Sequence, residues 1–230
     1  GAGSGKTKVL THRTAYFIAQ HQIKPENILL LTFTNKSSNE MMKRVDKLIG
    51  GINKVAGGTF HSFCVKVLRK YGQEVNLDQN FVIFDTADQL DTIKQAMLRV
   101  GVDPKNTKPG SILASISSAK NELIDPQTYA GFARGNFQQT VTTVYLAYQQ
   151  LLKKYQAVDF DDLLMLTVRL FKTSKETLNK LVDSFDQVLV DEYQDTNKAQ
   201  YEITKMLTLD KRNLTVVGDA AQAIYSWRGA

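Results

Sequence analysis

The first residues of the chain, GAGSGKT, combine small side chains with one cation and one hydroxyl in the order typical of a phosphate-binding loop. Small residues let successive backbone N–H groups point at an anion, and the helix N-terminus that follows adds its positive dipole. In this pattern Lys6 reaches the β- and γ-phosphates of a nucleoside triphosphate, and the Thr7 hydroxyl binds Mg²⁺. The alternative is a flexible glycine-rich terminus, but a Gly-Lys-Thr sequence opening an apolar helix favours the loop. The residues predicted to hold the nucleotide are Gly1, Ala2, Gly3, Ser4, Gly5, Lys6, Thr7 and Lys8.

A pair of carboxylates, Asp191 and Glu192, follows the apolar run QVLV. The carboxyl ends of strands are where open α/β sheets bind ligands. An acidic residue there can hold Mg²⁺, and its neighbour can orient and deprotonate an attacking water. A solvated acidic loop is the alternative, and the phosphate-binding loop in the same chain makes it the weaker one. We therefore predict Asp191 as a metal ligand, together with Thr7, and Glu192 as a catalytic base.

Two further segments place aromatic and polar residues where a ligand would pass. In TFTNK, Phe33 can stack on a base while Thr34 and Asn35 contact phosphate. Alternatively, Phe33 is a core residue and Asn35 caps the next helix. In TFHS, which follows two glycines, Thr59 and His61 suit phosphate contact, although an isolated histidine is more often a hydrogen-bonded loop residue.

Two more segments raise questions of the same kind. The sequence DFDDLL (159–164) bunches three acidic residues, and this spacing is more typical of a helix start than of a metal site. The sequence VVGDAAQAIYSWRGA (216–230) begins like a buried strand and ends with Tyr225, the only tryptophan, Trp227, and Arg228 in close succession. Residue types alone do not explain why these three side chains are crowded there.

The elements that must position these residues alternate between strands and helices. Three apolar runs, 28–33, 187–191 and 214–218, are typical of fully buried parallel strands. Apolar residues recur at helical spacing after the first two runs and over 7–20. Strand–helix alternation of this kind predicts an α/β fold with a parallel sheet flanked by helices.

The middle of the chain is mainly helical and interrupts this alternation. The strongest helical patterns lie at 62–72, 86–101, 143–156 and 159–172, and a loop-like sequence, KNTKPGS, lies at 105–111. We therefore predict two domains. A discontinuous nucleotide-binding domain comprises residues 1–61 and 183–230, and a helical insertion comprises residues 62–182.

Composition narrows the class of protein further. The chain has 230 residues, a net charge of +6, three histidines and one cysteine. The excess of basic residues mildly favours a polyanionic partner. The histidines and Cys64 are too few for a typical structural zinc site, and one cysteine cannot form an intrachain disulfide. With no long apolar stretch and no signal-peptide pattern, we expect a cytoplasmic protein without a membrane partner.

Taken together, the motifs resemble those of one known family. The sequences GAGSGKT, LTFTNKSSNEM, GTFHSF, DFDDLL, VLVDEYQDTNKAQYEI and VVGDAAQAIYSWRGA are similar, in this order, to the N-terminal half of UvrD/PcrA/Rep-type superfamily 1A DNA helicases. The resemblance spans nearly the whole chain, and the DEYQDTN string is its most specific part. It implies a RecA-like ATP-binding domain interrupted by a helical subdomain.

The resemblance also implies an activity and a set of site residues. The family moves 3′→5′ on single-stranded DNA at the expense of ATP and unwinds duplexes at single-strand/duplex junctions, in DNA repair and DNA replication. By resemblance, Gly3, Gly5, Lys6 and Thr7 bind ATP and Mg²⁺, Asp191 holds the metal, Glu192 is the base and Gln222 senses the γ-phosphate. Phe33, Tyr225 and Trp227 resemble the aromatic residues that stack on DNA bases, and Asn35, Thr59, His61 and Arg228 resemble residues that line the DNA path. The second RecA-like domain would be a partner supplied by the same full-length protein, so we expect the isolated chain to hydrolyse ATP poorly.

Three alternatives remain at this point. A RecB/AddA-type helicase–nuclease subunit shares these motifs and would carry a nuclease domain after residue 230. A non-catalytic nucleic-acid-binding paralogue conflicts with the retained Lys6, Asp191, Glu192 and Gln222. A small-molecule P-loop kinase conflicts with the aromatic cluster and with DEYQD.

We predict that Trp227→Ala, in the full-length protein, uncouples DNA binding from stimulation of the ATPase. Stacking on one base contributes about 1–3 kcal/mol to DNA binding. Removing the largest ring should therefore lower the affinity for DNA while leaving the affinity for the nucleotide unchanged. Titrations of single-stranded DNA against ATP turnover, and of nucleotide against the free protein, measure the two effects separately. A collapse of nucleotide binding would instead identify Trp227 as a core residue.

Overall fold

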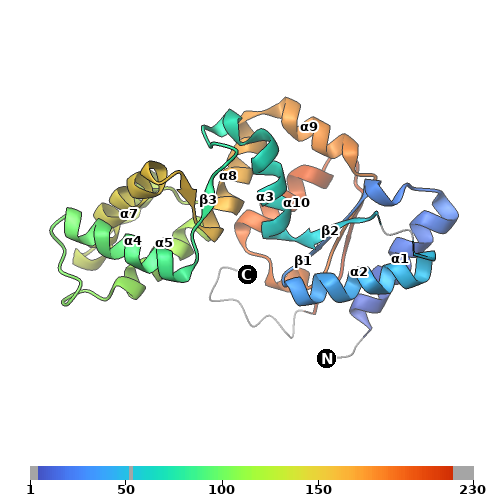
Figure 1. Ribbon diagram of the computed structural model, residues 1–230, viewed down its shortest axis with the longest axis horizontal. Helices are drawn as coiled ribbons and strands as arrows, with labels where there is room; N and C mark the ends of the chain where they lie inside the picture. Colours follow the sequence, from blue (N-terminus) through green and yellow to red (C-terminus); the bar gives the residue numbers. More distant parts are fainter. Residues whose placement is uncertain (1–4, 52–53, 220–230) are drawn as a thin grey trace.

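The computed structural model describes residues 5–51 and 54–219. At its centre is a parallel four-stranded sheet with the strand order β2-β1-β5-β6. Its strands are β1 (Ile28–Thr32), β2 (Ala56–Thr59), β5 (Gln187–Val190) and β6 (Leu214–Val216). Figure 1 shows helices on both faces of this sheet and a further group of helices that extends to one side. The predicted α/β fold with a parallel sheet is confirmed.

The central strand β1 is buried along its whole length, and its side chains alternate between two hydrophobic cores. Ile28 and Leu30 belong to one core, whereas Leu29 and Leu31 belong to the other. This is why the run ILLL contains no polar residue: both faces of a parallel sheet are covered by helices.

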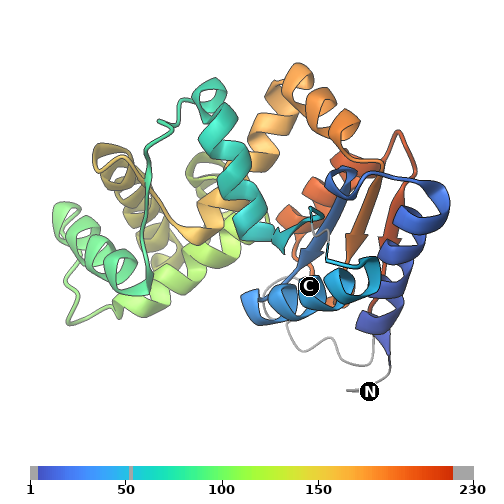
Figure 2. The same cartoon turned by 45° about the vertical axis from the view of Figure 1, so that its right-hand side comes forward.

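The covering helices come from both ends of the described chain and from its middle. The helices α1 (Lys6–His21) and α2 (Asn35–Ile49) pack on the face that carries Ile28 and Leu30. The opposite face is covered by α3 (Phe60–Tyr71), α8 (Phe160–Thr173) and α10 (Lys198–Thr208), and α9 (Lys175–Ser184) packs against α8 and α10. Figures 1 and 2 show these two layers from different sides.

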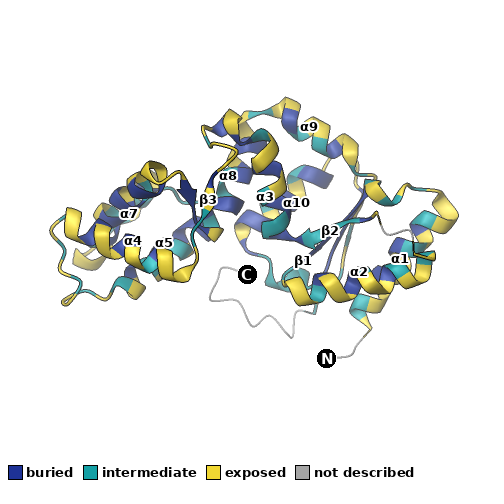
Figure 3. Ribbon diagram, viewed as in Figure 1, coloured by how far each residue is buried: buried dark blue, intermediate teal, exposed yellow. Residues whose placement is uncertain are grey.

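A separate hydrophobic core lies among four other helices, which we call the helical lobe. They are α4 (Thr86–Arg99), α5 (Pro109–Asn121), α6 (Pro126–Phe132) and α7 (Asn136–Lys154). Figure 3 shows their buried residues gathered on the inner faces of the lobe. A parallel pair of short strands, β3 (Val82–Ile83) and β4 (Ala157–Val158), lies where the chain enters and leaves the lobe. Short 3₁₀ helices complete the described chain: η1 (Pro25–Asn27), η2 (Gly72–Val75) and η3 (Tyr193–Asp195).

The structure differs from the sequence-based expectation at the edge of the sheet, at β2 and within the helical lobe, among other places. The run at 214–218 was expected to be fully buried, but Leu214 and Val216 are 37% and 41% exposed in an edge strand. Hydrophobic periodicity does not distinguish an edge strand from a central one. The sequence did not predict β2, because Ala-Gly-Gly-Thr has no apolar run, and it did not predict α5, which begins at Pro109 inside the expected loop.

No helix in the described part of the chain combines the length and the apolar composition needed to cross a bilayer.

The neighbours Met97 and Leu98 on α4 provide a test of the lobe's core, because Met97 is fully buried and Leu98 is 67% exposed. We predict that Met97→Ala lowers the free energy of unfolding by about 2–5 kcal/mol, since it removes packed atoms and leaves a cavity. Leu98→Ala is the matched control, with an expected change within about 0.5 kcal/mol. Denaturant titration measures both, and equal effects would contradict the described core.

Candidate nucleotide and nucleic-acid site

The end of the predicted phosphate-binding loop joins directly to helix α1. Gly5 caps the helix with φ of +80°, a left-handed conformation that glycine adopts without the cost a Cβ would impose. Lys6 and Thr7 are the first two residues of the helix, and Lys8 is exposed on the next position. The predicted residues Gly1, Ala2, Gly3 and Ser4 lie outside the described residues.

The structure brings the two predicted halves of the nucleotide site together. The Thr7 hydroxyl donates a hydrogen bond to Asp191 Oδ2 at 3.2 Å, across 184 positions of sequence. Beside it, Lys6 Nζ lies 3.4 Å from Glu192 Oε2. One cation, one hydroxyl and two carboxylates therefore meet where α1 begins and β5 ends.

Burial changes the chemistry of Asp191. Its side chain is buried, with 2% exposure, and loss of hydration raises the pKa of the carboxyl group above its usual range. The backbone N–H of Glu192 donates to Asp191 Oδ1 at 3.0 Å, and this bond opposes the rise in pKa. Glu192 itself has φ of +50°, a left-handed conformation that is uncommon for residues with a side chain. Such strain, held at the end of a buried strand, is typical of a functional position.

Gln194 is a member of this site that the sequence analysis did not assign. Its side-chain amide donates to Glu192 Oε2 at 2.7 Å and to Asp195 Oδ2 at 3.1 Å, and its oxygen accepts from the backbone N–H of Asp219 at 3.0 Å. A Cβ at Gly218 would lie 2.7 Å from that oxygen, so a larger residue there would displace the Gln194 side chain. The signal was present in the DEYQD string, but no spacing rule shows which neighbour the glutamine contacts.

The donor set fits a nucleotide-bound magnesium ion. Among the described residues, no group of three or more His, Cys, Asp and Glu side chains is arranged to hold a metal. Mg²⁺ is usually bound by one or two carboxylates, with water and substrate phosphate oxygens completing its coordination. Asp191 and the Thr7 hydroxyl supply hard oxygen ligands, and Lys6 supplies a cation beside them.

The residues predicted to contact nucleic acid after β1 are divided between core and surface. Phe33 is half-buried and packs edge-on against Phe60, with ring centroids 5.9 Å apart. Thr34 is the cap of α2, where its hydroxyl accepts from the backbone N–H of Ser37 at 3.1 Å. Asn35 is exposed as the first residue of α2. The alternative that Asn35 caps this helix is therefore wrong by one position, because the cap is the residue before the first helical turn.

The second pair of predicted residues surrounds the start of α3. Thr59 ends β2 and caps α3 by accepting from the backbone N–H of Ser62 at 3.1 Å. His61 is half-buried and lies edge-to-face against Phe160, with centroids 5.7 Å apart. Phe160 is 45% exposed, and the sequence analysis had interpreted its segment only as a helix start. The only signal for it in the sequence is an aromatic residue between two acidic ones.

All of these side chains lie at one edge of the sheet. Thr32 at the end of β1 pairs with Thr59 at the end of β2, and Leu31 pairs with Val190, which precedes Asp191. Parallel strands place their carboxyl ends together, so the nucleotide residues and the predicted nucleic-acid residues share this edge. The predicted residues Gln222, Tyr225, Trp227 and Arg228 lie outside the described residues.

Comparison with known proteins agrees with this geometry. A model of the UvrD/REP helicase N-terminal domain matches residues 1–230. The chain belongs to the UvrD/REP helicase N-terminal domain family. It is 49% identical to the ATP-dependent DNA helicase PcrA of Bacillus subtilis (strain 168), over 100% of this chain and 31% of that protein. It is 46% identical to the helicases of the same name from Staphylococcus epidermidis (strain ATCC 12228 / FDA PCI 1200) and Staphylococcus aureus (strain COL), over 100% of this chain and 32% of each relative.

The chain thus spans about a third of the length of the curated relatives it matches. The resemblance inferred from the motifs is confirmed at the level of the family.

The raised pKa of the Asp191 carboxyl group leads to a prediction about the stability of the folded protein. Ionised Asp191 destabilises the fold, and this cost disappears as the pH falls through the raised pKa toward the ordinary value of about 3.9. We predict that Asp191→Asn, whose oxygen can still accept from the Glu192 N–H while its amide nitrogen donates to the Thr7 hydroxyl, raises the melting temperature at neutral pH by about 2–4 °C for each kcal/mol recovered. The gain over the wild type should shrink as the pH is lowered in calorimetry.

The control for this test is Asp183→Asn, which alters an exposed aspartate on α9 and should leave the melting temperature nearly unchanged. A lower melting temperature for Asp191→Asn at neutral pH would contradict the assigned cost of burial.

Proposed function

We propose that this chain is the first motor domain of an ATP-dependent DNA helicase that moves 3′→5′ along single-stranded DNA. The observation that carries the proposal is the meeting of Lys6 and Thr7 with Asp191 and Glu192 at the carboxyl edge of the sheet. Membership of the UvrD/REP family supports it, and the relatives named above are ATP-dependent DNA helicases. Those names favour a helicase over a helicase–nuclease subunit.

In this proposal the four side chains divide the work of ATP hydrolysis. Lys6 holds the β- and γ-phosphates and neutralises the charge that develops on them. Thr7 and Asp191 provide oxygen ligands for Mg²⁺, which when bound supplies further positive charge at the phosphates. Glu192 orients and deprotonates the attacking water. Its ion pair with Lys6 and its hydrogen bond from Gln194 hold the carboxylate at the site before the nucleotide arrives.

The path for DNA in this proposal runs along the same edge of the sheet. Helices α2 and α3 both begin there, and helix N-termini attract phosphate through their dipoles and free N–H groups. Exposed Phe160, with His61 against its ring, offers a face on which a base can stack without regard to sequence. Such sequence-tolerant contacts suit a protein that must move along any strand. Further proposed DNA contacts are Phe33, Thr34, Asn35, Thr59, Tyr225, Trp227 and Arg228.

We keep the domain division as part of the proposal. Residues 1–61 and 183–230 form the ATP-binding domain, and residues 62–182 are inserted into it. The separate core of the helical lobe supports an insertion. Because α3 and α8 share a core with the sheet, the helical lobe is the part of the insertion that is set apart.

The proposal includes a second RecA-like domain, supplied by the rest of a longer protein. The short share of each relative that this chain covers supports this point. ATP would then lie between the two motor domains, and the substrate would be a single-strand/duplex junction.

The decisive variant is Lys6→Met in the full-length helicase. We predict that DNA-stimulated ATP turnover falls about 10²–10³-fold, because a preorganised positive charge at the phosphates is lost. Binding of single-stranded DNA in the absence of nucleotide should remain. Lys180→Met is the matched control, because it removes another lysine–glutamate ion pair, on the surface of α9, with Nζ 2.7 Å from Glu176.

The direction of movement is tested with two otherwise identical duplexes. One carries a 3′ single-stranded tail and the other a 5′ tail, and strand separation is followed by fluorescence. Unwinding of the 3′-tailed duplex alone is expected. Normal turnover of the Lys6→Met variant, or unwinding that depends on a 5′ tail, would overturn the proposal.

A further inference from the structure

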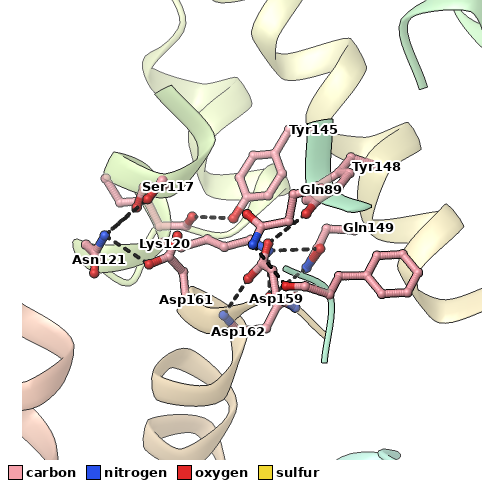
Figure 4. A network of polar contacts seen from close by, with 12 residues as sticks. Gln89, Ser117, Lys120, Asn121, Tyr145, Tyr148, Gln149, Asp159, Asp161 and Asp162 are labelled. Atoms are coloured by element: carbon pink, nitrogen blue, oxygen red, sulfur yellow. Dashed lines mark hydrogen bonds and ion pairs between the residues drawn. The ribbon is translucent and has the colours of Figure 1, made fainter. Parts of the chain in front are cut away.

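A fully buried lysine lies where the helical lobe meets the rest of the molecule. Lys120 Nζ, at the C-terminal end of α5, lies 2.6 Å from Asp159 Oδ2, 2.8 Å from Asp162 Oδ1 and 3.2 Å from Gln149 Oε1. These acceptors use all three ammonium donors. Burial alone lowers the pKa of Lys120, but the charges of the two aspartates raise it above its usual range, so the ion remains charged. Figure 4 shows the lysine between the two carboxylates.

The partners of Lys120 fix the first turn of α8. Asp159 caps this helix by accepting from the backbone N–H of Asp162 at 2.8 Å, and Asp162 accepts in return from the backbone N–H of Asp159 at 3.3 Å. The Tyr148 hydroxyl donates to Asp159 Oδ2 at 3.0 Å. Phe160 stands between the two aspartates in sequence, so the contacts that hold them also set where its ring emerges beside His61.

The next residue, Asn121, connects the same turn to a second helix. Its amide nitrogen donates to Asp161 Oδ1 at 3.2 Å, and its oxygen accepts from the side-chain amide of Asn197. Asn197 caps α10 by accepting from the backbone N–H of Gln200 at 2.9 Å. The cap follows Asp195 closely in sequence, at the end of the segment that begins with Asp191 and Glu192.

We call this group the polar corner. Its members are Lys120, Asn121, Tyr148, Gln149, Asp159, Asp161, Asp162 and Asn197. The polar corner lies between the core of the helical lobe, to which Ala157 belongs, and the core that α3 and α8 form with the sheet, to which Val158 belongs. The polar corner therefore touches the start of α8, which presents Phe160, and the start of α10, which follows the catalytic carboxylates.

Stability alone does not account for a buried ion cluster at this place. Removing two or more charges from water costs several kcal/mol per ion, and well-packed apolar replacements are often equally stable or more stable. What hydrogen-bonded ions supply, and apolar packing does not, is a fixed direction for each partner. In this structure, the hydrogen bonds and ion pairs fix the orientation of the first turn of α8 relative to α5 and α10.

We propose that Lys120 and Asn121 are positioning residues that couple the DNA-facing pair His61–Phe160 to the nucleotide site. This inference rests on the function proposed above. A shift of the Glu192 segment moves the start of α10, and the Asn197–Asn121–Asp161 chain of hydrogen bonds carries that shift to the first turn of α8. Neither residue contacts the nucleotide residues or Phe160 in the described hydrogen bonds, so both act through others.

The test uses Asn121→Ala in the full-length helicase. We expect ATP turnover without DNA, and the affinity for single-stranded DNA without nucleotide, to stay within about two-fold of wild type. The stimulation of turnover by DNA should fall about 5-fold or more, the size typical of a lost coupling between sites.

Asn213→Ala is the matched control. Asn213 has the same 8% exposure as Asn121, and its amide donates to the backbone carbonyl of Phe185 at 3.1 Å, as the Asn121 amide donates to that of Ser117 at 2.9 Å. Both variants remove a buried amide and its bond to a backbone carbonyl, but only Asn121→Ala should lose stimulation. Equal stimulation in the two variants would reduce the polar corner to a purely structural role and overturn the inference.

A second variant guards against a general loss of folding. Asn197→Ser keeps a capping oxygen for α10 but is too short to reach Asn121. It should lower stimulation like Asn121→Ala, and the double variant should fall no further, which is the non-additivity expected of one connected pair. Additive losses would contradict the coupling. If the wild-type protein shows no stimulation by DNA, the proposed function fails instead, so the two failures are distinguishable.

Discussion

The parallel pairing of β1 with β5 is the constraint on which the molecule depends. Leu29 pairs with Val188 and Leu31 with Val190, although the whole helical lobe separates these strands in sequence. The entropy cost of closing a loop grows only slowly with its length, so a long insertion at this point is tolerated. Because the strands are parallel, the pairing also places the residues after both strands at one edge. Thr7 and Asp191 meet at that edge.

Two kinds of interaction hold the inserted chain to the sheet. Apolar packing of α3 and α8 on the sheet is strong but weakly directional. The buried ion cluster around Lys120 adds direction, because three acceptors surround its ammonium group at short distances. The molecule thus combines a packed interface, which sets how firmly the insertion is attached, with a polar corner, which sets how the first turn of α8 is oriented. Phe160 and His61 occupy the surface where that orientation matters.

Local sequence signals predicted much of the fold because they act over short distances. The run ILLL is apolar on both faces, as a covered parallel strand must be, and α2, α3, α4, α8 and α10 follow their apolar spacing. Local sequence signals did not predict an element when its formation depends on neighbouring parts of the fold. The strand β2 is formed by Ala-Gly-Gly-Thr, whose small residues extend beside β1 only because the pairing partner is there. In α5, Lys120 occupies an apolar face and is stable there only because Asp159 and Asp162 arrive from another helix.

The sequence by itself determined the family, the parallel α/β architecture and the residue types of the nucleotide site, since motif order and hydrophobic periodicity are properties of the linear chain. Tertiary structure alone decided which side chains meet. It paired Lys6 with Glu192, inserted Gln194 between Glu192 and Asp195, and placed Phe160 against His61. The physical reason is that hydrogen bonds and ring contacts act over a few ångströms in space, and only the folded sheet brings residues distant in sequence within that range.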